Sequence, residues 1–435
     1  MNKSTRSLAR SLNGFPDGFW WLWTSTLVNR LGTFVFPFLA IYLTSVLGYS
    51  AAHAGLILAI YGVGASVGAL LGGELSDRIG RRATMGGAQL VTAVVTAAMG
   101  FVTGSTAIAV LAFSVGAAAS ASRPAISAMI VDLVPPEDRQ RAFSVNYWAS
   151  NIGFGFSAAV AGVLAHQGYL WLFIGDAVTT LLCAVVMWVK LPETRPAGPE
   201  VPSPVPAARV GLGHILGDSR FLVLCLLGFA MWMMFYQGSS SLSVAMAGSG
   251  IGTQAYGLII ALNGILIVVL QIPVTSMLKG RDRRMVLALS ALLTGVGFGV
   301  NGFAGTSVIL YSLSVMVWTL GEIAYAPASA AAVAELSDER AHGRYQGLFG
   351  FSTSVASILA PLVGGLALDL WGGPALWLLC VAVGVATAAG FWALLTVTRR
   401  ASGRSDVVPE SEPPLLEQEQ ERELVPSSPT RSPVA

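Results

Sequence analysis

Long apolar runs separated by short polar connections account for most of the chain. Of its 435 residues, 54% are hydrophobic and only 11% are charged, whereas soluble domains carry about 25% charged residues. Such a chain has too much apolar surface for one soluble core, so we expect lipid to solvate much of it. Each run is close to the roughly 20 residues that a helix needs to cross a bilayer. We therefore predict an all-α membrane protein with twelve transmembrane helices, at residues 20–46, 53–73, 84–103, 107–131, 143–165, 168–190, 220–246, 255–278, 285–303, 307–332, 345–368 and 374–397.

Most basic residues lie in alternate connections between the apolar runs. The odd-numbered connections between runs contain no Lys or Arg, and nearly all basic residues lie in the even-numbered connections and the termini. Connections that face the cytoplasm carry such an excess of Lys and Arg. The charge pattern therefore predicts that the even-numbered connections and both termini are cytoplasmic. One miscounted span would destroy this alternation.

The two halves of the chain resemble each other. Polar residues repeat in register, so that Pro124 and Asp132 correspond to Pro327 and Glu335. Both copies lie between spans of the same direction, which predicts two six-helix bundles related by a pseudo-two-fold axis along the membrane normal, with a site between them. The expected divisions are a cytoplasmic N-terminus, a first bundle, a flexible linker rich in Pro and Ala, a second bundle and a disordered tail, at residues 1–19, 20–190, 191–219, 220–398 and 399–435.

Two short motifs connect the chain to a known family. The connection after the second run reads Gly73-x-Leu75-x-Asp77-Arg78-x-Gly80-Arg81-Arg82. It closely resembles the loop 2–3 signature of the major facilitator superfamily, and Leu191-Pro192-Glu193-Thr194 resembles the family's usual exit from the first bundle. Over residues 20–397 the chain is most similar to twelve-span bacterial drug/proton antiporters. The resemblance implies a multi-pass transporter of the bacterial inner membrane that works by alternating access.

The loop motif is expected to act as a conformational latch. Glycine permits a tight turn and close helix approach. The resemblance implies that Asp77 caps the N-terminus of span eleven, near residues 343–347, in the outward-facing state, where free N–H groups and the helix dipole favour an anion. We expect Arg81 to reach Asp132, and Arg283 or Arg284 to reach Glu335 in the second half.

These contacts are expected only when the cytoplasmic side is closed, so that they bias a two-state equilibrium. The alternative is an ordinary basic turn that only orients the helices. The predicted latch comprises Gly73, Asp77, Arg78, Gly80, Arg81, Arg82, Asp132 and Glu335.

Four charged residues lie inside the predicted spans, away from their ends, where a charge costs at least a few kcal/mol and normally faces a bundle interior or a wet cavity. Glu322, near the middle of span ten, is our candidate for the residue that carries the coupling proton; the alternative is a structural acid paired with a basic group. Arg123 precedes Pro124 and either pairs with Glu322 in one state or is a structural arginine near the cytoplasmic side. Arg30 is either a contact for a substrate anion or a fixed counter-charge. Asp176 lies outside the spans that the family uses for its cavity, which favours a packing or hydrogen-bonding role.

Span seven carries a run of methionine and aromatic residues from Met231 to Tyr236. Such side chains form an adaptable surface for a bulky apolar substrate, although they are equally suited to packing or to facing lipid. The residues that we predict to line the substrate cavity are Arg30, Arg123, Trp232, Tyr236, Gln237 and Trp318.

The remaining patterns bear on the function. The chain has no His pair at metal-binding spacing, no phosphate-binding Gly-Lys-Ser/Thr loop and no nucleophile elbow, so we expect neither an enzyme nor a bound metal or cofactor. The proton is the expected coupling ion, and the expected partners are a small-molecule substrate and the lipid bilayer, with no nucleic acid and a monomeric state. We predict proton-coupled export of drug-like or amphipathic molecules. The alternatives are proton symport of a polar or anionic nutrient or peptide, and a membrane receptor that transports nothing.

Overall fold

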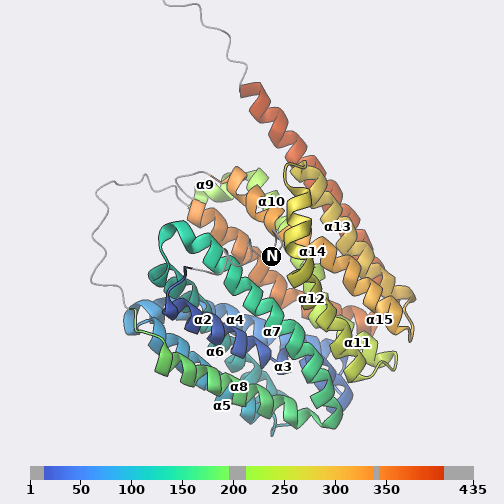
Figure 1. The fold of residues 1–435 in the computed structure, drawn as a ribbon. Helices are drawn as coiled ribbons and strands as arrows, with labels where there is room; N and C mark the ends of the chain where they lie inside the picture. Colours follow the sequence, from blue (N-terminus) through green and yellow to red (C-terminus); the bar gives the residue numbers. More distant parts are fainter. Residues whose placement is uncertain (1–13, 195–211, 338–341, 406–435) are drawn as a thin grey trace, which may run out of the picture.

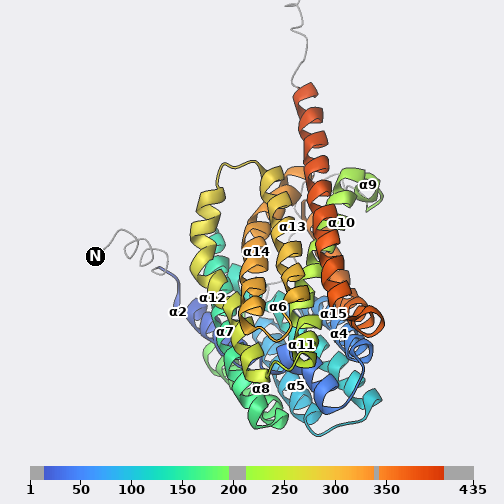
Figure 2. The ribbon, with the colours of Figure 1, turned by 90° about the vertical axis from the view of Figure 1, so that its right-hand side faces the viewer.

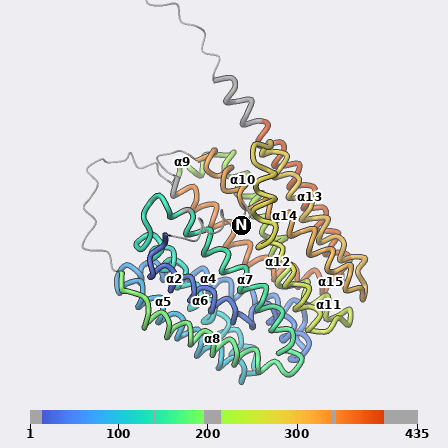
Figure 3. Tube along the Cα trace, in the orientation of Figure 1, coloured from blue at the N-terminus to red at the C-terminus, as the bar shows by residue number. Residues whose placement is uncertain are grey.

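The computed structural model describes residues 14–194, 212–337 and 342–405. Within these ranges the chain is helical, with short turns between helices and no strand. The helices of the N-terminal half lie together beside those of the C-terminal half (Figures 1 and 3). The N-terminal half contains α2 (Asp17–Leu31), α3 (Val35–Ile41), the π-helical turn η1 (Tyr42–Val46), α4 (Ala51–Ile79), α5 (Arg81–Met99), α6 (Ser105–Leu133), η2 (Pro136–Asp138), α7 (Arg139–Gln167) and α8 (Tyr169–Lys190). The C-terminal half contains α9 (Leu212–Gly217), α10 (Ser219–Phe235), η3 (Tyr236–Ser239), α11 (Ser241–Gly248), α12 (Thr253–Leu278), α13 (Arg283–Val300), η4 (Asn301–Phe303), α14 (Val308–Leu336) and α15 (His342–Ser405).

The helices agree with twelve membrane spans. Within the described ranges, ten helical segments are long and apolar enough to cross a membrane. The last of them, residues 344–396, contains two spans, because Gly372 interrupts the helical backbone with a φ of 79°. The remaining span is α5, whose polarity comes from two arginines, a glutamine and three threonines.

Spans one and seven are each broken near the middle, which the apolar pattern does not predict. Span one stops at Leu31 and resumes at Val35. At the break Gly32 packs closely against α8, since a Cβ there would lie 1.7 Å from Thr179 Oγ1. Span seven passes through η3 between α10 and α11. Such breaks leave backbone groups without helical partners near the middle of the predicted spans, where other groups must satisfy them.

Small residues set the distances between helices within each half. Gly64, Gly68 and Gly72 follow one another at four-residue spacing along α4 and face α6, so that a Cβ on Gly68 would lie 1.9 Å from the Ala117 carbonyl oxygen. The side-chain-free stripe therefore lets the two backbones touch, as is usual for helices packed in lipid. In the C-terminal half, Gly295 of α13 meets α15 in the same way.

The two halves contact each other toward one end of the molecule. We call the end with the α4–α5 and α12–α13 turns the basic end, and the other the opposite end. α4 packs on α15 near Gly55 and Pro361, and α7 packs on α12 where Gly162 meets Gly257. Both contacts lie in the helix portions nearer the opposite end. Figure 2 shows the last part of α15 projecting beyond the other helices.

Some predicted boundaries differ from the structure. The tail was expected to be disordered from residue 399, whereas α15 continues to Ser405 because no proline interrupts it before Pro409. The short helix α9 lies within the predicted linker. Residues 1–13 of the predicted N-terminus, 195–211 of the linker and 406–435 of the tail lie outside the described residues.

Candidate functional site

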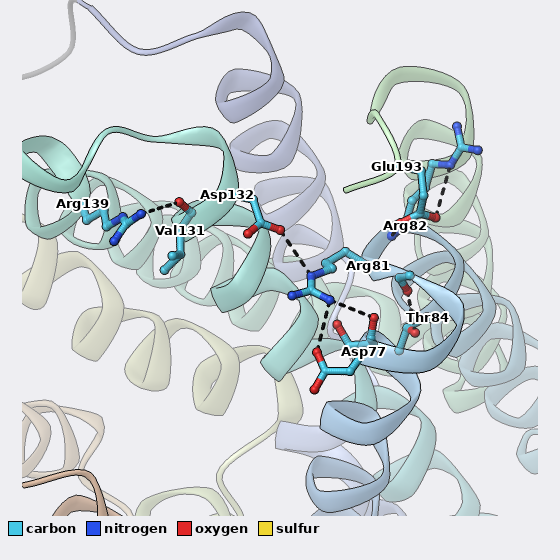
Figure 4. Close-up of polar contacts among 10 residues, drawn as sticks. Asp77, Arg81, Arg82, Thr84, Val131, Asp132, Arg139 and Glu193 are labelled. Carbon is cyan, nitrogen blue, oxygen red and sulfur yellow. Dashed lines mark hydrogen bonds and ion pairs between the residues drawn. The ribbon is translucent and has the colours of Figure 1, made fainter. Parts of the chain in front are cut away.

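Arg81 lies at the centre of a polar network at the basic end of the N-terminal half (Figure 4). Its Nη1 donates to Asp77 Oδ1 and to the Ser76 carbonyl oxygen, each at 3.1 Å, and its Nε forms an ion pair with Asp132 Oδ2 at 3.3 Å. Only 10% of the Arg81 side chain is exposed. The structure therefore contains the expected Arg81–Asp132 contact, which fixes the α4–α5 turn against the end of α6.

The turn itself depends on Gly80 and Glu193. Gly80 has a φ of 100°, which favours glycine, and a Cβ at this position would lie 2.5 Å from the Glu193 carboxyl group. Glu193 accepts hydrogen bonds from the backbone N–H of Arg82 at 3.0 Å and of Ala83 at 3.1 Å. It thereby caps α5, where the helix dipole favours an anion. The role of Glu193 was not predicted, although its motif was noticed.

The second half repeats the ion pair. Arg283 pairs with Glu335, whereas Arg284 pairs with Asp282 at 2.6 Å. The Arg81–Asp132 and Arg283–Glu335 pairs each join two helices of one half, and both are present although the halves are separated at the basic end, as described below. These ion pairs were expected only with this end closed; in this conformation they are present with it open, because each joins helices within one half.

Asp77 and Arg78 of the predicted latch are exposed to solvent, and Gly73 is partly exposed. Arg78 pairs with Glu74 at 2.5 Å on the surface. A Cβ on Gly73 would meet nothing within 4 Å, so no helix approaches closely there in this conformation. The Asp77 side chain is 69% exposed. A carboxylate that capped the first turn of α15 would be largely buried against that helix. Asp77 therefore does not make the expected cap in this conformation.

A cap of this kind occurs at the opposite end, where it connects the two halves. Asp369 of α15 accepts hydrogen bonds from the backbone N–H of Ala51 at 3.0 Å and of Ala52 at 2.8 Å. These groups begin α4, so a carboxylate from the C-terminal half stabilises the first turn of a helix in the N-terminal half. Sequence reasoning missed Asp369. The available signal was an acid placed at the very end of an apolar run.

A polar cavity of about 260 Å³ lies inside the N-terminal half. Arg30 and Arg123 line it together with Asp176. Asp176 accepts hydrogen bonds from the Val35 N–H at 3.1 Å and from Thr180 Oγ1 at 3.3 Å. It thus satisfies a backbone group freed by the break in span one, which agrees with a hydrogen-bonding role. Its position on the cavity wall was not expected.

Glu322 is a residue of α14, and its side chain contacts α12. Asn263 Nδ2 donates to Glu322 Oε2 at 2.8 Å and to Thr319 Oγ1 at 3.1 Å. Among the described residues, no basic side chain pairs with Glu322. The proposed Arg123–Glu322 pair is therefore not formed in this conformation, in which Arg123 lines the polar cavity of the N-terminal half together with Arg30.

The residues predicted to line the substrate cavity divide into two groups. Trp318 is 4% exposed and stacks on Phe298 with ring centroids 5.4 Å apart. Gln237 is 3% exposed and donates to the Ala360 carbonyl oxygen at 3.0 Å. In this conformation both pack against helices of their own half and line neither the polar cavity nor the groove described below. Trp232 and Tyr236 are half-buried and in ring contact at 5.6 Å, and Tyr236 is an electrostatic neighbour of Arg123.

A groove of about 1440 Å³ separates α7 from α12 and α14 in their portions nearer the basic end. Its walls include Phe143, Tyr147 and Pro327, and its rim includes Lys279 and Arg281. The halves are therefore apart at the basic end and joined at the opposite end.

The comparisons with known proteins agree with this architecture. The family model described as Major Facilitator Superfamily matches residues 22–279 and 239–431. The chain belongs to the major facilitator superfamily. Among solved structures, the chain is similar to the nucleoside transporter NupG, with a TM-score of 0.71, 16% identity and coverage of 87% of this chain and 99% of that one. It is also similar to the POT family transporter PepTSo, with a TM-score of 0.73, 14% identity and coverage of 89% and 99%.

Relatives by sequence are bacterial transporters. The chain is 26% identical over 362 residues to the MFS-type transporter YqjV of Bacillus subtilis, which covers 81% of this chain and 87% of the relative. It is 27% identical over 413 residues to the multidrug resistance protein MdtH of Cronobacter sakazakii, covering 92% and 98%. The chain is thus a multi-pass membrane transporter.

Replacing Arg81 with Ala should destabilise the protein. The change leaves Asp132 and the Ser76 carbonyl without their buried donor, which we expect to cost about 2 kcal/mol. Thermal unfolding of the purified protein in detergent would measure it. The control is Glu74→Gln, which alters an exposed ion pair of small expected effect. Equal shifts in the two variants would contradict the central role of Arg81.

Replacing Asp369 with Ala should loosen the opposite end. Loss of a helix cap costs about 1 kcal/mol. This lowers the ratio of molecules with the opposite end closed to those with it open by roughly fivefold. A cysteine at Leu58, which is 4% exposed in α4, should then react correspondingly faster with a membrane-impermeant maleimide. The control is Asp218→Ala, because Asp218 caps α10 in its own half through the N–H groups of Arg220 and Phe221. An unchanged labelling rate in Asp369→Ala would refute a closing role for this cap.

Proposed function

We propose that the protein exports amphipathic small molecules across the bacterial inner membrane in exchange for protons. Two membrane-embedded sites support this function: the arginine-lined cavity in one half and the Glu322 site in the other. The multidrug resistance proteins among its relatives favour export over import.

In this proposal the basic end faces the cytoplasm, as the distribution of Lys and Arg predicts. The structure then corresponds to an inward-facing state. Its groove between α7 and α12 is open toward the cytoplasmic side, and its apolar walls suit a cargo that partitions into the inner leaflet. The Asp369 cap holds the outer end closed. Alternating access requires this cap to break and the basic end to close.

The observation that carries the proton coupling is the isolation of Glu322 from any described basic partner. A carboxyl group paired with Arg would keep its negative charge through the cycle. Glu322 has instead one amide donor, Asn263, and Tyr147 of the other half is an electrostatic neighbour. Relative movement of α7 therefore changes its surroundings. Binding and release of a proton can follow this movement, as exchange transport requires.

Replacing Glu322 with Gln should uncouple transport from the proton gradient. The amide keeps the shape and the contact region with Asn263 but cannot take up and release a proton. In proteoliposomes with an imposed pH gradient and a panel of amphipathic dyes of different charge, gradient-driven accumulation should fall to the level of empty liposomes. Exchange of preloaded dye without a gradient should remain close to the parent rate.

The matched control is Glu74→Gln, the same chemical change at an exposed ion pair, which should retain accumulation. Gradient-driven accumulation in Glu322→Gln at the parent level would rule out this residue as the proton carrier. Loss of both accumulation and exchange in a correctly folded variant would assign Glu322 to cargo binding or structure instead.

The two arginines in the cavity also favour a second function, proton symport of an anionic nutrient or peptide into the cell. The sign of the cargo-induced proton flux separates the two. Export by exchange moves protons opposite to the cargo, and symport moves them in the same direction.

A further inference from the structure

Arg30 and Arg123 approach the same cavity from two helices. Arg30 lies in the last turn of α2, just before the break in span one, and Arg123 lies in α6 next to Pro124. Both line the cavity of about 260 Å³, and they are close enough for their charges to interact. Two positive side chains are thus held against mutual repulsion within the membrane-spanning part of the protein, where each is costly.

Neither guanidinium group has a hydrogen-bond acceptor or an acidic partner among the described residues. Each carries five N–H donors and no acceptor. Asp176 is the acid on this wall, but its oxygens accept from the Val35 N–H and from Thr180. The cavity therefore presents up to ten strong donors without a protein acceptor.

The rest of the wall combines polar and aromatic groups. Asn29 donates to Gln89 at 3.1 Å along one side. Phe36 and Tyr61 stack at a tilt with ring centroids 5.1 Å apart on another. A ligand of this cavity can thus place an anionic group on the arginines and an apolar body against the rings.

We propose that Arg30 and Arg123 bind a carboxylate, phosphate or sulfonate group carried by an amphipathic cargo. The planar fork of Arg matches such oxyanions through paired, charge-assisted hydrogen bonds. Tyr236, at the start of η3, is an electrostatic neighbour of Arg123 and Tyr61, so the second half lies near this site. The site selects anionic over cationic amphiphiles, because a cation would meet two like charges. This inference rests on the proposed function, since it names the class of cargo.

Equilibrium binding to the full-length protein in detergent, without any gradient, tests the site. The probes are naphthoate, naphthylmethylamine and naphthylmethanol, which share one ring system but differ in charge. Inorganic phosphate and vesicles of anionic phospholipid compete separately, which distinguishes a cargo site from an inorganic-anion or lipid-headgroup site. Naphthoate should bind at least about tenfold more tightly than the amine, the scale of one charge-assisted hydrogen bond.

Arg30→Gln and Arg123→Gln should each weaken naphthoate binding by about tenfold and leave naphthylmethanol binding unchanged. Arg123→Lys keeps the charge but loses the fork, so its affinity should lie between those of the parent and Arg123→Gln. The control is Arg220→Gln, at an exposed position at the start of α10. Size-exclusion profiles and thermal unfolding identify any variant that fails to fold.

Equal affinity for naphthoate and the amine, or full affinity in both glutamine variants, would overturn the site. Displacement of naphthoate by an equal concentration of phosphate alone would identify an inorganic-anion site and overturn the cargo assignment. Displacement by the anionic vesicles would identify a lipid-headgroup site and would also overturn the cargo assignment. Naphthoate that binds but is never transported would contradict the proposed function and leave the site intact. Proton-coupled export of cationic dyes by a protein that does not bind naphthoate would contradict the anion site and leave the proposed function intact.

Discussion

A charge inside a membrane must be paired, hydrogen-bonded or given access to water or a ligand, and this constraint governs the structure. Asp176 meets it by accepting the N–H of Val35, which the break in span one leaves without a helical partner. Glu322 is held by a single amide donor. Arg30 and Arg123 meet it through a polar cavity alone. A charge whose hydrogen bonds are all made by the protein has a structural role. A charge with few protein partners is available to bind a proton or a cargo.

The two ends of the molecule use similar chemistry for different purposes. At the basic end, Arg81 and Arg283 tie helices of their own halves together. At the opposite end, Asp369 joins one half to the other by capping α4. Because α4 and α15 run antiparallel along their contact, Asp77 at the end of α4 is placed to do the same for α15 at the basic end. The open basic end and the exposed Asp77 agree with only one of these two caps being made at a time.

The sequence predicted what depends on hydropathy and on local repeats. The number of spans, the two halves and the contacts of Arg81 and Arg283 follow from apolar length, charge placement and internal repetition. The breaks in spans one and seven were not predictable from the apolar pattern, because a helix interruption in the membrane depends on partners such as Asp176 and Ala360 from distant segments. The packing of Trp318 and Gln237 against their own half was not predictable for a related reason: hydropathy does not reveal which face of a buried helix meets its own half. The role of Asp369 was not predicted, because the helix that it caps, α4, is distant in the sequence.

Distances between spin labels at both ends test the central claim, that the two halves close alternate ends around these charges. One pair at Ile79 and Met277 reports on the basic end, and another at Phe101 and Phe303 on the opposite end; all four side chains are exposed. The three native cysteines are buried. On lowering the pH or adding cargo, one distance should shorten as the other lengthens. Distances that change together, or that do not change in a protein that transports, would contradict it.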